Sequence, residues 1–143
     1  MALVVPALAE TPAWYTGIDS ITVLQPGQPG NQAKVDAIHS AQQYSQFGAR
    51  RDAVLLLPGV YTDLNITTGY YTSVVGAGAS SSAVQVGAVE SFDGPNGGAT
   101  CIFWRSAEGV AVKRKANTWA TSQACPLRRM SYAGDLFLSG QGQ

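Results

Sequence analysis

The chain has few charged residues. Only 13% of its 143 residues are Asp, Glu, Lys or Arg, and nine basic residues balance nine acidic ones. A typical soluble domain carries about 25% charged residues. The neutral balance argues against a nucleic-acid partner, because phosphates attract a basic surface. It also predicts weak repulsion between copies and therefore a tendency to associate.

Histidine, cysteine and long apolar runs are also scarce. The single histidine, His39, cannot supply the ligand set of a zinc site, so we expect no metal, and no motif indicates a cofactor. No apolar run is long enough to cross a bilayer as a helix. The two cysteines, Cys101 and Cys125, form either a disulfide in an oxidising compartment or two buried thiols.

Two features of the sequence point to an extracellular protein. Residues 2–9 are similar to the end of a signal peptide, although the segment also fits an N-terminal strand or arm of the mature chain. Asn65 opens an Asn-Ile-Thr triplet, which is an acceptor sequence for N-glycosylation. We therefore expect a secreted protein, and a disulfide between Cys101 and Cys125 fits that compartment.

Glycine and short apolar runs are abundant. The chain has 16 glycines and 45% hydrophobic residues. The run in residues 52–57 is stopped by Pro58-Gly59, and a second run at Val74-Val75 is stopped by Gly76-Ala-Gly78. Such runs predict buried strands, and their recurrence predicts a chain that coils and lays each strand on the one before.

The element pattern predicts an irregular arm over residues 1–31 and one mainly β domain over residues 32–143. Asn31 is expected to cap a helix over residues 32–47, with Val35 and Ile38 on its apolar side and Gly48 after its end. A first strand is expected at 20–24. Further strands are expected at 53–57, 65–67, 73–75, 83–86, 101–104, 110–113, 119–122, 128–132 and 135–138.

The order of these elements resembles a known superfamily. A helix, an apolar strand ending in Leu57-Pro-Gly-Val-Tyr61 and a strand ending at Gly78 resemble the start of pectate-lyase-like right-handed parallel β-helix proteins. The blocks at 103–108, 119–130 and 134–138 are similar to secreted actinobacterial and fungal β-helix proteins labelled as coagulation factor 5/8 type domain proteins. These are related to β-1,3-glucanase-like glycoside hydrolases. The resemblance implies a right-handed parallel β-helix with an N-terminal capping helix.

The chain departs from that group in two ways. It stops at residues 139–143, where such proteins continue through many more turns, and cysteines at 101 and 125 are not expected there. A coil without a C-terminal cap has open backbone edges that recruit other chains. We therefore expect either the N-terminal part of a longer protein or a homo-oligomer in which another copy covers the open end.

Candidate catalytic residues come from the carboxylates. Glycoside hydrolysis uses two carboxyl groups about 5 to 10 Å apart. Glu108 and Asp135 lie about one turn of the predicted coil apart and are candidates for the acid and the base or nucleophile. The alternative is that Glu108 pairs with Arg105 or Arg128 at a corner of the coil.

Candidate sugar-binding residues are Arg105, Arg128 and Trp119. Arginine binds polar groups in bidentate fashion, and aromatic faces stack on pyranose rings. The alternative is that the aromatic residues pack in the coil and the arginines bridge turns. For Trp104 we favour packing, whereas for Trp119 the two interpretations have equal weight.

The sequence therefore supports two functional hypotheses. The first is a secreted, carbohydrate-active β-helix module that binds a polysaccharide, is glycoside hydrolase-like if it is an enzyme, and forms the N-terminal part of a glucan hydrolase-like protein. The second is a non-catalytic, self-assembling β-helix whose partners are copies of itself.

Overall fold

The computed structural model describes residues 12–92, 102–120 and 123–140. Its elements, in chain order, are β1 (Ile21–Leu24), α1 (Asn31–Gln42), β2 (Asp52–Leu56), β3 (Gly59–Thr67), β4 (Thr72–Gly76), the short 3-10 helix η1 (Ser81–Ala83), β5 (Val84–Glu90), β6 (Arg105–Glu108), β7 (Ala111–Val112), β8 (Ala116–Ala120), β9 (Leu127–Arg128), β10 (Ser131–Tyr132) and β11 (Asp135–Ser139).

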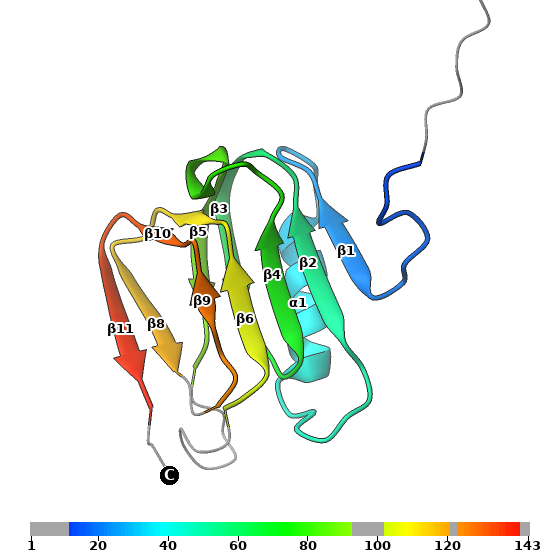
Figure 1. The fold of residues 1–143 in the computed structure, drawn as a ribbon, viewed down its shortest axis with the longest axis vertical. Coiled ribbons are helices and arrows are strands. Elements are labelled where there is room, and N and C mark those ends of the chain that lie inside the picture. The colour runs from blue at the N-terminus through cyan, green and yellow to red at the C-terminus, as the bar shows by residue number, and fades with distance from the viewer. Residues whose placement is uncertain (1–11, 93–101, 121–122, 141–143) are drawn as a thin grey trace, which may run out of the picture.

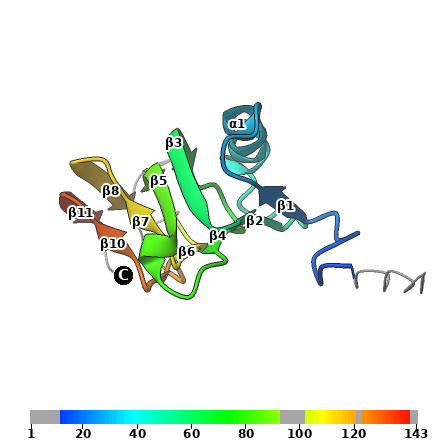
Figure 2. The same ribbon diagram turned by 90° about the horizontal axis from the view of Figure 1, so that it is seen from above.

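The strands form three parallel sheets that the chain visits in turn (Figures 1 and 2). The strand orders are β1-β2-β4-β6-β9, β10-β7-β5-β3 and β11-β8, and every pairing between them is parallel. Neighbours in each sheet come from successive passages of the chain, as in a coil. The chain is therefore a mainly β parallel solenoid of about three turns with one helix near its N-terminus, and the predicted fold class is confirmed.

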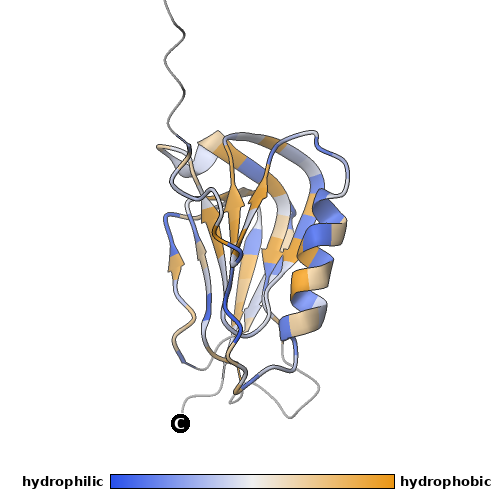
Figure 3. Ribbon diagram, turned by 90° about the vertical axis from the view of Figure 1, so that its right-hand side faces the viewer, coloured by the Kyte–Doolittle hydropathy of each residue, from blue (hydrophilic) through white to orange (hydrophobic). Residues whose placement is uncertain are grey.

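Inward-facing side chains stack along the coil and form the core. Figure 3 shows that the strands carry most of the hydrophobic residues. Because strand side chains alternate between faces, one set points inward and the other points out of the coil. Two buried columns are Val54, Val74 and Ala107 in the five-stranded sheet, and Tyr61, Val86 and Val112 in the four-stranded sheet.

Helix α1 covers the free edge of the four-stranded sheet. It lies beside β3 (Figure 2). Its Val35 and Ile38 are buried, as predicted. The side chain of Gln32 donates from Nε2 to the Asn65 carbonyl oxygen at 2.8 Å, and its Oε1 accepts from the Asn65 backbone N–H at 3.0 Å. This side-chain amide therefore satisfies backbone groups of β3 that a neighbouring strand would otherwise satisfy.

Both ends of α1 differ from the prediction. The N-cap is Gly30, with φ 82°, and no side chain caps the helix. Asn31 instead donates from Nδ2 to the Gln25 carbonyl oxygen at 2.8 Å. The helix ends at Gln42, which is fully buried and donates to the Arg50 carbonyl oxygen at 3.1 Å and to Asp52 Oδ2 at 2.8 Å. These two contacts tie the end of the helix to the start of β2.

Two predicted strands are also shifted. The strand expected at 101–104 is β6 instead, because Trp104 has φ 59° and leaves the extended conformation just before the sheet begins. The strand expected at 128–132 is divided into β9 and β10, and Arg129 between them has φ 49°. The composition of a short apolar run does not indicate which residue at a corner adopts the left-handed conformation. No helix among the described residues is long and apolar enough to cross a membrane.

Candidate functional site

A groove of about 550 Å³ runs over the outer face of the five-stranded sheet. Ala53, Ser73 and Ser106 occupy equivalent positions on β2, β4 and β6, and these small outward-facing residues form its floor. The Ser106 hydroxyl lies 2.9 Å from that of Ser73. The floor thus combines low relief with hydroxyl groups, which suits a flat ligand that carries hydroxyls of its own.

A stack of flat side chains forms one wall of this groove. Arg51, Tyr71 and Trp104 each lie one residue before a strand of the sheet, on successive turns. The Arg51 Cζ is 3.5 Å from the centroid of the Tyr71 ring. The rings of Tyr71 and Trp104 stack with centroids 6.4 Å apart and planes 17° apart. Cation–aromatic and offset parallel ring contacts are both attractive, so the wall is formed before any ligand binds.

The corner that carries this stack has the same unusual backbone on three turns. Tyr71, Trp104 and Ala124 have φ values of 54°, 59° and 50°. For residues other than glycine the left-handed region costs roughly 1–2 kcal/mol. Three such residues in one column therefore hold their side chains in a fixed direction at an energetic cost, a pattern often associated with functional sites.

Charged residues close the inner side of the groove. Asp52, which also lines it, accepts from Arg50 Nε at 2.8 Å, and this hydrogen bond raises the pKa of Arg50. Arg105 is 3% exposed and donates from Nη1 to the Thr68 carbonyl oxygen at 3.1 Å. Burial lowers the pKa of His39, and the positive charge of Arg105 lowers it further.

Of the predicted sugar-binding residues, Arg105 lines the groove but is almost fully buried, and Trp119 does not line it. Arg105 also donates to Ser91 Oγ at 3.1 Å, so it bridges segments inside the coil. Trp119 is 1% exposed and donates from Nε1 to the Cys125 carbonyl oxygen at 3.0 Å. Burial favours the packing alternative for both side chains. The tryptophan in the groove is Trp104, which is 55% exposed rather than packed in the coil as expected.

The register separates the two candidate catalytic carboxylates. It places Arg128 beside Glu108 and Asp135 beside Ala116, so Glu108 and Asp135 are not neighbours on successive turns. Glu108 lies in the five-stranded sheet and pairs with Arg129 at 3.0 Å, rather than with Arg105 or Arg128. The expected approach of the two carboxylates is therefore wrong in register, and their catalytic role stays a prediction.

Arg128 is exposed on β9, and the register places it beside Glu108 on the neighbouring strand β6. Both residues lie on strands of the same sheet as the groove floor, and alternation puts them on its outer face. Arg128 is therefore the predicted sugar-binding residue with an exposed side chain. Its role stays a prediction.

Two modifications were predicted, a glycan at Asn65 and a disulfide between Cys101 and Cys125. The Asn65 side chain donates from Nδ2 to the Asp63 carbonyl oxygen at 2.9 Å and accepts from Arg114 at 2.7 Å. The atom that would carry a glycan, Asn65 Nδ2, therefore already donates a hydrogen bond, and the glycosylation stays a prediction. Cys101 lies outside the described residues, so the disulfide with Cys125 stays a prediction.

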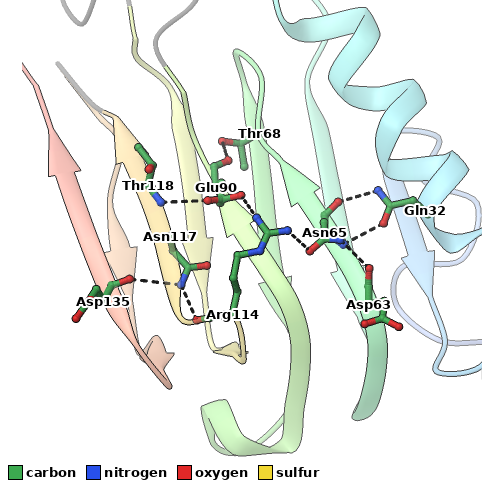
Figure 4. A network of polar contacts seen from close by, with 9 residues as sticks. All are labelled: Gln32, Asp63, Asn65, Thr68, Glu90, Arg114, Asn117, Thr118 and Asp135. Carbon is green, nitrogen blue, oxygen red and sulfur yellow. Dashed lines mark hydrogen bonds and ion pairs between the residues drawn. The ribbon is translucent and has the colours of Figure 1, made fainter.

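A polar network crosses the four-stranded sheet (Figure 4). Glu90 accepts from Arg114 at 2.5 Å and from the Thr118 backbone N–H at 3.2 Å. Arg114 also reaches Asn65, whose backbone contacts Gln32 on α1. The network links β3, β5 and β8 to the helix. Within the described ranges, no three His, Cys, Asp or Glu residues gather to hold a metal ion.

One sequence pattern could have indicated the wall of the groove. Arg51, Tyr71 and Trp104 are large planar side chains, each directly before the residue that opens a strand of one sheet. The signal can be seen only when the turns are aligned. The intervals between these residues are unequal, because the turn that contains η1 and residues 93–101 is longer than its neighbour.

Comparisons with known proteins agree with the fold. No protein-family model matches the chain. A curated exo-β-1,3-glucanase from Streptomyces sp. strain SirexAA-E is 39% identical over 127 residues, which are 86% of this chain and 21% of that protein. The structure of sacteLam55A from the same organism superposes with a TM-score of 0.78 at 39% identity, covering 82% of this chain and 22% of that one.

A variant of sacteLam55A in complex with glucose gives the same TM-score of 0.78, at 40% identity and the same coverage. The chain spans about a fifth of the length of these relatives. Identity and superposition both extend over most of the chain, so the likeness is not confined to one motif. The chain is homologous to a fragment of the β-helix of an exo-β-1,3-glucanase and shares the solenoid fold of that fragment.

Proposed function

We propose that this chain is a carbohydrate-active β-helix and that its groove over the five-stranded sheet binds a β-glucan. The observation that carries the proposal is the exposed ring of Trp104, held in a stack with Tyr71 beside a floor of hydroxyl groups. Sugars present apolar C–H faces and polar edges, so a flat ring next to hydroxyls matches both parts of the ligand.

The homologous enzyme supports the choice of ligand. It is named an exo-β-1,3-glucanase, and a variant of it has been solved with glucose. These facts belong to that protein, which is about five times longer than the matched region. For the present chain they make a β-1,3-glucan the first ligand to test.

Titration calorimetry with a soluble β-1,3-glucan tests the proposal. We expect the wild-type chain to bind and Trp104→Ala to lose at least tenfold in affinity, which corresponds to about 1.4 kcal/mol. The matched control is Trp14→Ala, because Trp14 is also exposed, at 73%, but does not line the groove. Absence of binding across a panel of glucans and pectins would contradict the proposal, as would equal losses in the two variants.

Catalysis and secretion are further parts of this proposal. Because the register does not bring Glu108 and Asp135 together, we propose only Glu108 as a catalytic carboxylate, which predicts release of reducing sugar that Glu108→Gln abolishes. Secretion predicts that the chain, expressed in a eukaryotic secretory host, appears in the medium and carries a glycan at Asn65. A silent enzyme assay would leave a binding module, whereas retention inside the cell would contradict secretion.

A second candidate function is self-assembly. Phe137 and Leu138 on β11 are 57% and 70% exposed, and β11 pairs with a described strand only on its β8 side. Exposed apolar residues on an edge strand favour pairing with another chain. Sedimentation velocity would show an oligomer that Leu138→Asp dissociates. A monomer at every concentration would exclude this candidate.

A further inference from the structure

The stack that forms the groove wall ends one turn early. Arg51, Tyr71 and Trp104 occupy the same corner on three successive turns. On the next turn the register pairs Phe103 with Gln123 and Ala107 with Leu127, so Ala124 takes the position beside Trp104. A methyl group stands where the preceding turns carry an arginine, a tyrosine and a tryptophan.

This change leaves one face of Trp104 without a stacking partner from its own column. Tyr71 has Arg51 on one side and Trp104 on the other, whereas Trp104 contacts Tyr71 on one side and faces Ala124 on the other. The groove is lined by Trp104, Ser106, Ala124 and Pro126 at this level. Strands in a sheet are about 4.8 Å apart, and stacked rings lie roughly 3.5–4 Å apart. The space beyond the Ala124 methyl, beside the second face of Trp104, therefore has the depth of one ring, and we call this space the slot.

We infer that the slot between Trp104 and Ala124 binds one glucopyranose ring, which stacks on the indole as the next member of the column. The inference rests on the proposed function and adds which side chain stacks on the sugar and where in the groove the sugar ring lies. In β-glucopyranose every hydroxyl is equatorial, so both faces present only C–H groups. The ring edge then lies toward the Ser106 and Ser73 hydroxyls, which donate and accept hydrogen bonds.

The decisive variant fills the slot and removes no contact group. In Ala124→Tyr the new ring continues the column, and the left-handed backbone already carries aromatic residues at the equivalent Tyr71 and Trp104. We expect an unchanged or raised thermal midpoint together with at least a tenfold loss of affinity for the glucose pentasaccharide. Trp14→Ala, outside the groove, should bind like the wild type. Affinity of Ala124→Tyr within twofold of the wild type would overturn the inference.

A second measurement on the wild-type chain covers the case in which Ala124→Tyr fails to fold. Three tryptophans give three indole N–H signals in a proton–nitrogen NMR spectrum. The pentasaccharide should shift the Trp104 signal and leave those of exposed Trp14 and buried Trp119 in place. Binding without a Trp104 shift would overturn the slot and leave glucan binding intact, whereas no binding at all would overturn both.

Discussion

Arg114→Met would leave the Glu90 carboxylate buried without its ion-pair partner. The Glu90 side chain is 9% exposed and that of Arg114 is 42% exposed, and the two form the ion pair of the network in Figure 4. Removing one partner of a fully buried pair costs roughly 3–5 kcal/mol. Glu90 keeps its bond from the Thr118 N–H, and the exposed half of the Arg114 site admits water, so we expect about 2–3 kcal/mol.

Urea unfolding followed by circular dichroism measures this loss. With a slope of about 2 kcal/mol per molar urea, the midpoint should fall by roughly 1–1.5 M. The matched control is Arg128→Met, because Arg128 is exposed and has no ion pair within the described part of the chain. The control should change the midpoint by less than about 0.3 M, as surface substitutions usually do.

A double variant separates the unpaired charge from other effects. Glu90→Gln combined with Arg114→Met removes both charges, so it should recover at least half of the lost stability. The lost hydrogen bond from Arg114 to Asn65 would not be recovered. If Arg114→Met unfolds at the wild-type midpoint, or the double variant is no more stable than Arg114→Met, the carboxylate is not the source of the cost.

Three further predictions concern the core, the tyrosines and one corner. Trp119→Ala should lower the free energy of unfolding by about 3–5 kcal/mol in the same urea assay, because it empties a fully buried site, and a loss below 1 kcal/mol would contradict its place in the core. Burial raises the pKa of Tyr61 and of Tyr132 to about 12, so both should ionise late in an ultraviolet titration. The unfolded tyrosines lose their protons near pH 10, so the native state holds more protons between about pH 10 and 12 and stability should fall across that interval; a constant stability there would refute the assignment. Gly76→Ala should destabilise by about 1–3 kcal/mol, because a Cβ there would overlap the backbone carbonyl oxygen of Gly109, and a wild-type melting temperature would show that the two turns are not so close.

The strands that were predicted well are those whose signal is local. Val54, Leu55 and Leu56 are all buried, and their continuous apolar run ends at a Pro-Gly corner. The alternation of Val84 and Val86 around Gln85 likewise appears in the structure. In these cases neighbouring residues alone indicate whether a segment is extended and which side chains are buried.

The predictions that failed depend on residues far apart in the sequence. Arg105 is buried because acceptors near residues 68 and 91 lie within reach of its guanidinium, and no local pattern brings them together. Trp104, which was expected to pack, is exposed because a left-handed corner turns it outward. Alternation in β8 turns Trp119 inward, which is one of the two alternatives that the sequence left open. The register of the turns decides both outcomes, and the sequence does not show it directly.

The contact between Gln32 and Asn65 also limits the symmetry of any assembly made through the four-stranded sheet. The helix occupies the β3 edge, so among the described strands only the β10 edge of that sheet is open to another copy. Head-to-tail pairing within this sheet would need both its β3 and its β10 edge, so the pairing left to this sheet is between two β10 edges. Copies that joined there would be related by a twofold axis and would form a closed dimer rather than a filament.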